Sequence, residues 1–181
     1  MKIQYTLNEN DFLEHQLFTA SKTERINKQR RKSWIMVTFS FFAFSVLFFN
    51  KENKSLIYSF LGFGIISLIF YPIYQRNHYK RHYLNFIKET YKNRFNETAT
   101  LLFDEDYIET NDLSGETKIK YSALEETNEI KDYYFLKLKT GGSIIIPKSR
   151  IDNIEIFKLQ LNSISEKYNL KNNVELNWKW K

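Results

Sequence analysis

Two long uncharged apolar runs dominate the pattern of hydrophobic and polar positions along the chain. The first occupies Ser33–Asn50 and the second Ser55–Tyr74, with the short polar segment Lys51–Lys54 between them. At 1.5 Å per residue the second run makes a helix of about 30 Å, which matches the hydrocarbon core of a bilayer. Both runs are apolar all round, whereas a surface helix of a soluble protein carries a polar stripe. The pattern therefore predicts a two-helix transmembrane hairpin over residues 33–50 and 55–74.

Amphipathic segments flank this hairpin on both sides. Residues 1–32 begin with the alternating stretch Lys2–Leu7, which predicts a strand, and continue as a basic helix that Asn8 or Asn10 caps. Residues 75–97 predict a basic amphipathic juxtamembrane helix. Its apolar face packs either on the headgroup layer or on the C-terminal domain, because periodicity does not distinguish lipid from protein.

From Thr98 onward the pattern is typical of β structure. Apolar and charged residues alternate in Lys118–Tyr121 and again in Leu136–Lys139. Gly141-Gly142 follows the second of these stretches and predicts a two-residue hairpin turn. We therefore expect several antiparallel strands in this part of the chain.

A helix and a tail complete the sequence. Asp152 is the expected N-cap, and Glu155 three residues later completes a capping box. The tail Asn169–Lys181, in which apolar residues alternate from Val174 to Trp180, either adds an edge strand or places Trp178 and Trp180 at a membrane surface. The apolar positions of the helix keep helical spacing and predict one buried face: Ile154, Phe157, Leu161, Ile164 and Tyr168. The predicted fold is α+β, with the hairpin followed by a small antiparallel β domain, residues 98–181, that this helix closes.

Charge gives the expected orientation of the hairpin. The chain has 27 Lys and Arg against 21 Asp and Glu, a net charge of +6, and its cations concentrate in Lys22–Lys32 and in residues 75–97. Because cations mark the cytoplasmic side of membrane proteins, both termini are expected in the cytoplasm of a multi-pass protein of the cell membrane. Cations beside apolar spans do not favour nucleic acid as a partner. The expected anchors at the membrane interface are Arg30, Arg31, Lys32, Trp34, Arg76, Lys80 and Arg81.

Residues that carry chemistry are few. The chain contains no cysteine, which excludes disulfides, thiolate metal sites and a cysteine nucleophile. His78 and His82 have the spacing of a zinc helix, but their neighbours are cationic and a third ligand is not evident. The acidic segment Asp104–Glu109 lacks the ligand ladder of a calcium loop. We therefore expect a non-catalytic protein without metal, cofactor or small-molecule substrate.

Three segments of the β region resemble a known family. Tyr121-Ser122, Lys131–Leu138 and Ile144–Lys148, together with the closing helix and the preceding hairpin, are similar to the YcxB-like family of bacterial membrane proteins. The resemblance implies a pleckstrin-homology-like C-terminal domain and a membrane location. It implies no activity.

Three functions remain open at this point. The β domain is expected to bind a protein partner, or a second copy of this chain, beside the lipid bilayer. Alternatively it recognises lipid through Lys118, Lys120, Lys137 and Lys139, although these lysines also fit the solvated face of half-buried strands. The third possibility is an immunity or stress protein that protects the membrane.

Overall fold

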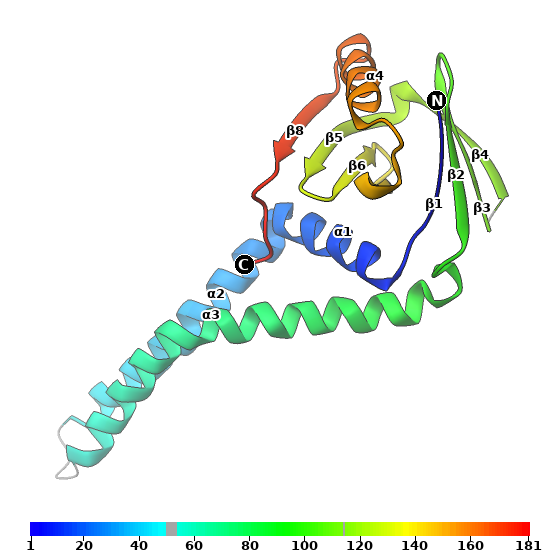
Figure 1. The fold of residues 1–181 in the computed structure, drawn as a ribbon. Coiled ribbons are helices and arrows are strands. Elements are labelled where there is room, and N and C mark those ends of the chain that lie inside the picture. The colour runs from blue at the N-terminus through cyan, green and yellow to red at the C-terminus, as the bar shows by residue number, and fades with distance from the viewer. Residues whose placement is uncertain (50–53, 114) are drawn as a thin grey trace. The chain divides into compact units, whose positions relative to one another are not determined.

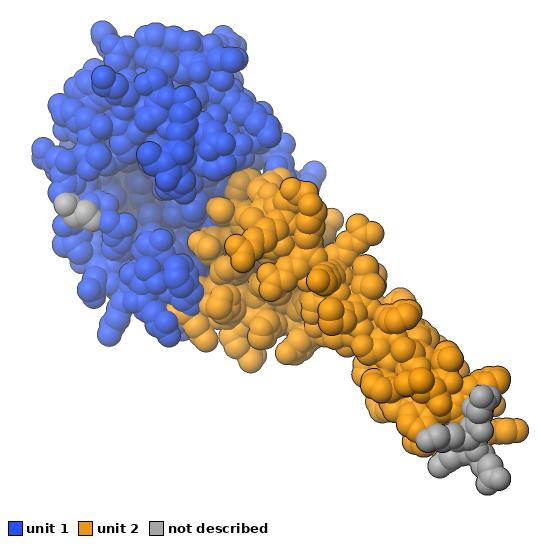
Figure 2. Space-filling view, turned by 180° about the vertical axis from the view of Figure 1, so that it is seen from behind, with its two compact units in different colours: residues 1–15, 86–179 blue, residues 16–85, 180–181 orange. Residues whose placement is uncertain are grey.

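The computed structural model describes residues 1–49, 54–113 and 115–181. Apart from Lys54, the polar segment that was expected to connect the two apolar runs lies outside these residues. The chain divides into two compact units, shown in different colours in Figure 2: residues 1–15 with 86–179, and residues 16–85 with 180–181. They are called the β unit and the helical unit below, and each is described by itself.

The first sheet of the β unit includes the N-terminal strand. Its order is β1-β2-β3-β4, and every neighbouring pair is antiparallel. β1 pairs with β2 from Lys2↔Leu102 to Thr6↔Thr98, so the start of the chain completes the sheet that begins at Thr98. The strands are β1 (Lys2–Thr6), β2 (Thr98–Phe103), β3 (Tyr107–Asp112) and β4 (Gly115–Lys120).

The second sheet of the β unit is mixed. Its order is β7-β6-β5-β8, and β8 runs parallel to β5 whereas the other pairs are antiparallel. The tail therefore does add an edge strand, but this strand ends at Glu175 and does not include Trp178 or Trp180. The strands are β5 (Leu124–Ile130), β6 (Tyr133–Leu138), β7 (Ser143–Pro147) and β8 (Lys171–Glu175).

Helix α4 (Ile154–Lys167) packs into one core with both sheets (Figure 1). Phe157, Leu161 and Ile164 are buried there, as the spacing predicts, but Ile154 stays 37% exposed. The predicted N-cap was wrong by one residue. Asn153 has extended backbone angles, and its side-chain oxygen accepts a hydrogen bond from the Ile156 N–H at 3.0 Å, so Asn153 caps the helix instead of Asp152.

The predicted two-residue turn at Gly141-Gly142 was also wrong. β6 ends at Leu138 and β7 begins at Ser143, so the connection has four residues. The Leu138 N–H donates to the Gly142 carbonyl at 2.8 Å, and the Gly141 N–H donates back to the Leu138 carbonyl at 2.9 Å. Gly141 has a φ of +95°, which glycine adopts without the steric cost that a side chain would impose.

Helix α1 (Glu9–Lys22) confirms Asn8 as its cap. The Asn8 side-chain oxygen accepts from the N–H groups of Asn10 at 2.8 Å and Asp11 at 3.2 Å. In return, the Asp11 carboxylate accepts from the Asn8 N–H at 2.6 Å. This reciprocal pair satisfies donors that the first helical turn leaves unpaired. The helix does not continue into the first apolar run, because Thr23 adopts an extended conformation and a new helix starts at Glu24.

Helices α2 (Glu24–Leu47) and α3 (Lys54–Thr90) form an antiparallel pair in the helical unit (Figure 1). Later residues of α2 contact earlier residues of α3, as an antiparallel arrangement requires. Ser33 Oγ lies 2.8 Å from Tyr71 Oη, and Thr38 Oγ1 lies 3.3 Å from Ser67 Oγ. These hydrogen bonds link polar side chains of the two helices.

A proline inside α3 makes room for a further hydrogen bond between the two helices. Pro72 lies inside α3 and has no N–H, so it leaves the carbonyl of Leu68 without its usual helical donor. The indole Nε1 of Trp34 on α2 donates to this carbonyl at 3.3 Å. α3 therefore continues through Pro72 to Thr90, and the second apolar run and most of the predicted juxtamembrane segment 75–97 are one helix.

Only α3, among the helices in the described ranges, is long and apolar enough to cross a membrane by length and composition. The expectation of two such helices is therefore met in part. α2 begins with a cationic stretch that includes Arg30, Arg31 and Lys32, and its uncharged section in the described residues runs from Ser33 to Leu47. That section is about 22 Å long, against a hydrocarbon core of about 30 Å.

Candidate functional site

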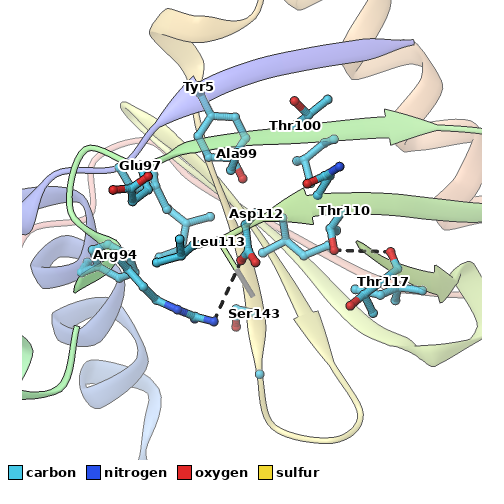
Figure 3. A pocket seen from close by; sticks show the side chains of 18 of the residues that line it. Tyr5, Arg94, Glu97, Ala99, Thr100, Thr110, Asp112, Leu113, Thr117 and Ser143 are labelled. Atoms are coloured by element: carbon cyan, nitrogen blue, oxygen red, sulfur yellow. Dashed lines mark hydrogen bonds and ion pairs between the residues drawn. The ribbon is translucent and has the colours of Figure 1, made fainter. Parts of the chain in front are cut away.

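A hollow of about 400 Å³ opens between the two sheets of the β unit (Figure 3). Two strands that lie at the end of their sheets line it: β4 with Thr117 and Ile119, and β7 with Ser143, Ile144 and Ile145. Neither β4 nor β7 has a second strand neighbour within the part of the chain that the structure describes. We call this hollow the β4–β7 groove.

The β4–β7 groove has an apolar floor and a polar rim. The floor includes Tyr5, Leu101 and Ile144, all of which are buried. Arg94 and Asp112 form an ion pair of 4.0 Å at the rim, drawn as a dashed line in Figure 3. Apolar walls with a few polar groups are typical of a binding site.

Hydroxyl groups and one tyrosine set the polarity of the groove. Thr110 Oγ1 donates to the Thr117 carbonyl at 3.4 Å across β3 and β4 (Figure 3). Burial raises the pKa of Tyr5 far above its usual range, and the negative charge of Asp112 is a second, smaller cause. The Tyr5 phenol therefore stays protonated and neutral, so the floor of the groove carries no charge from it.

The four lysines that sequence reasoning singled out lie on two different sheets. Lys118 and Lys120 belong to β4, Lys137 belongs to β6, and Lys139 follows β6 in the loop. Carboxylates raise the pKa of two of them, chiefly Glu109 for Lys118 and Glu125 for Lys137. Three of the lysines have partners of their own: Lys118 Nζ lies 3.3 Å from Glu109, Lys137 Nζ lies 3.1 Å from Glu125, and Lys139 Nζ donates to the Ser122 carbonyl at 2.8 Å.

The predicted anchors of the helical unit divide into inward-facing and outward-facing residues. The guanidinium of Arg30 lies over the rings of Trp180, 4.6 Å away, and Tyr79, 5.6 Å away. It also donates to the main-chain oxygen of Lys181 at 2.6 Å, while the Trp180 indole donates to the Arg76 carbonyl at 3.0 Å. Arg30 is thus enclosed by aromatic rings. The other cationic anchors have exposed side chains: Arg31, Lys32, Arg76, Lys80 and Arg81.

The acidic segment has a structural role that the sequence did not indicate. The Asp106 carboxylate lies 3.2 Å from Lys167 Nζ and accepts from the Tyr168 hydroxyl at 3.1 Å. The buried Tyr121 donates its hydroxyl to the Asp104 carbonyl at 2.8 Å, and burial raises its pKa to about 12. Asp106 thus ties the β2–β3 turn to the end of α4, and Asp104 ties it to the segment that follows β4.

The two histidines of the helical unit sit among tyrosines. His78 stacks on Tyr74 at a centroid distance of 5.7 Å, and His82 contacts Tyr83 at 5.6 Å. Within residues 1–49, 54–113 and 115–181, no group of three His, Asp or Glu side chains has an arrangement that could hold a metal ion.

Sequence reasoning missed the polar residues of the β4–β7 groove. Thr110 and Asp112 belong to β3, whereas Ser143 begins β7 in the other sheet. Alternation identified their strands, but it gave no signal that these residues share one hollow. That information comes from the arrangement of the two sheets.

Comparison with known proteins supports part of the resemblance seen in the sequence. A family model described as YcxB-like protein matches residues 103–161, which is about a third of the chain. The match covers most of the strands around the β4–β7 groove and half of α4. Searches of curated proteins and of solved structures found no match.

Proposed function

We propose that this chain is a non-catalytic membrane protein that presents its β unit to a protein partner. The β4–β7 groove carries the proposal, because its hollow is lined by two strands that each have one neighbour only among the described residues. An extended segment of a partner can add to the edge of such a strand through main-chain hydrogen bonds, while the hollow accepts its side chains. The surrounding fold of two sheets and one closing helix supports a pleckstrin-homology-like description of this unit.

The helical unit supports the membrane part of the proposal. α3 is long and apolar enough to span a bilayer, and α2 pairs with it along its length. α2 also exposes large apolar side chains, among them Phe39 at 69% and Val46 at 71%. Exposed apolar surface of this extent is typical of a protein surface that lipid or another protein covers. The pair thus acts as a hairpin anchor, and the cations at one end of it favour a cytoplasmic location for both termini.

Copurification of the full chain from its native membrane tests the proposal. We expect a specific partner, or a second copy of the chain, in stoichiometric amount. Thr117→Arg places a long charged side chain in the groove and is expected to lower recovery of the partner at least tenfold. Thr140→Arg is the matched control, because Thr140 is exposed in the β6–β7 loop and does not line the groove. Equal recovery with both variants, or no stoichiometric partner at all, would contradict the proposal.

Lipid recognition by the lysines of the β unit has less support. Lys118, Lys137 and Lys139 already have partners within the unit, so an anionic headgroup would have to compete with them. Flotation of the full chain with anionic and neutral vesicles, with and without glutamine at these three positions, distinguishes this alternative. Among the described residues, no contact in either unit supports a role in immunity or stress protection.

A further inference from the structure

One face of α2 carries cations at one end and apolar side chains at the other. Lys28, Arg31, Lys32, Ile35, Met36 and Phe39 together line a shallow hollow of about 380 Å³. Their spacing of three and four residues places them on one side of a helix. We call these six residues the α2 stripe. Ile35, Met36 and Phe39 are 51%, 57% and 69% exposed, so the apolar end of the stripe is uncovered.

The α2 stripe faces away from α3. The side of α2 that contacts α3 carries Ser33, Trp34 and Thr38, whose hydrogen bonds reach Tyr71, Leu68 and Ser67. At 100° per residue, the mean direction of the stripe lies roughly 140° from that of the contact face. The stripe is therefore available to a ligand without any change in the packing of the two helices.

The cationic side chains of the stripe have few interactions within the described residues. Lys28 has one partner, the exposed Glu24 at 2.6 Å, and an exposed pair of this kind contributes little energy. The side chains of Arg31 and Lys32 make no hydrogen bond or ion pair with any residue in the described parts of the chain. Arg30 differs from them, because Trp180 and Tyr79 enclose its guanidinium. The local field therefore favours an anion at the Lys28–Lys32 end of the stripe.

We propose that the α2 stripe binds an anionic phospholipid, with its phosphate at Lys28, Arg31 and Lys32 and its upper acyl chain along Ile35, Met36 and Phe39. The inference rests on the proposed membrane insertion and adds a lipid class to it. From Arg31 to Phe39 the stripe extends about 12 Å, which suits a headgroup followed by the first part of a chain. Basic residues directly outside an apolar span attract anionic lipid with about 1 kcal/mol each, a factor of about five.

Native mass spectrometry of the full chain tests this site. The protein is released from nonionic detergent micelles that contain equal amounts of phosphatidylglycerol and phosphatidylcholine, and the ratio of the two bound lipids is the readout. We expect a ratio above about ten for the unaltered chain. Replacing Lys28, Arg31 and Lys32 by glutamine is expected to lower the ratio about 10- to 100-fold. Arg76, Lys80 and Arg81 are three exposed cations of α3 outside the stripe, and their glutamine variant is the matched control, with an expected fall clearly smaller than that of the stripe variant.

Each alternative outcome has a distinct meaning. An equal fall in both triple variants would replace the site by diffuse attraction between basic residues and anionic lipid. Displacement of the bound phosphatidylglycerol by glycerol 3-phosphate would leave a phosphate site without a role for the acyl chain. A chain that enters micelles but shows no lipid preference overturns the inference alone. A chain that stays dispersed without detergent and binds neither lipid overturns the proposed membrane function as well.

Discussion

The buried carboxylate of Glu129 in the β unit has two cationic partners that differ in exposure. The Glu129 side chain is only 9% exposed, and its carboxylate lies 2.7 Å from Lys148 Nζ and 3.7 Å from Lys158 Nζ. Lys148 is itself 14% exposed, whereas Lys158 is 47% exposed. Taking a carboxylate out of water is costly unless a partner compensates its charge. Lys148 therefore supplies most of the compensation for Glu129.

Replacing Lys148 by methionine is expected to destabilise the β unit by about 3–5 kcal/mol, because Glu129 is left buried without its nearest cation. Lys158→Met removes the exposed partner and is expected to cost less than about 1 kcal/mol. Thermal unfolding followed by circular dichroism of the β structure compares the two variants. Equal shifts would mean that Glu129 is solvated in the native protein.

The buried His15 is expected to make the stability of the β unit depend on pH in the mildly acidic range. His15 packs edge-on against Phe135 at 5.1 Å, and burial lowers the pKa of its imidazole to about 4 from an ordinary value of about 6.5. Between these values the unfolded chain binds a proton at His15 and the folded chain does not, so stability falls as pH decreases from about 6.5 to about 4. His15→Gln is expected to reduce this slope by up to about 1.4 kcal/mol per pH unit. Denaturation series at several pH values measure it, and an unchanged slope would show that His15 titrates equally in both states.

At the scale of elements, close packing of α2 on α3 depends on one glycine. A Cβ at Gly64 would lie 3.0 Å from the ring of Phe42, whereas a Cβ at Gly62 would meet nothing within 4 Å. Phe41–Phe63 and Phe44–Phe60 ring contacts continue the interface toward the ends of the apolar runs. Small residues allow helices to approach closely in this way.

The two glycines form a matched pair for mutation. Gly64→Leu is expected to destabilise the helix pair by about 1–3 kcal/mol, because the new side chain overlaps Phe42. Gly62→Leu is expected to be neutral or slightly stabilising, since leucine has a higher helix propensity than glycine and open space surrounds it. Thermal melts of helical circular dichroism in detergent provide the comparison. A larger loss for Gly62→Leu would contradict the close contact between Gly64 and Phe42.

Sequence patterns predicted elements well where periodicity was strong and failed where polar residues are buried. Alternation and turn residues located most strands, and spacing identified the buried face of α4. β5 gave no such signal because Thr127, Asn128 and Glu129 are polar yet buried. Thr127 and Asn128 are satisfied by asparagines of β8, more than 40 residues later, and no local pattern reports such pairs. The β4–β7 groove was missed for the same reason, since it exists only after both sheets have formed.

At the scale of the whole molecule, the N-terminal strand and the C-terminal half depend on each other. Ile3 and Tyr5 of β1 are buried in the core that β2, β6 and α4 share. A fragment from Thr98 to Lys181 therefore lacks core side chains and leaves the edge of β2 unpaired, which favours aggregation. We expect this fragment to unfold without cooperativity, whereas the full chain unfolds cooperatively. A monodisperse fragment with a sharp melting transition would show that β1 is dispensable.

The arrangement of charge and apolar surface also predicts which part of the molecule faces the cell exterior. If α2 and α3 cross the membrane as a pair, the cationic ends of both helices lie on the cytoplasmic side and Lys54 lies on the other. The chain has no cysteine, so Lys54→Cys and Thr140→Cys each introduce a single thiol at an exposed position. A membrane-impermeant maleimide added to intact cells is expected to label Lys54→Cys strongly and to label Thr140→Cys only after the cells are opened. Labelling of Thr140→Cys alone in intact cells would invert the orientation. Labelling of neither variant before lysis, with both labelled afterwards, would mean that α3 does not cross, and the exposed apolar side chains of α2 and α3 would then need a protein partner to cover them.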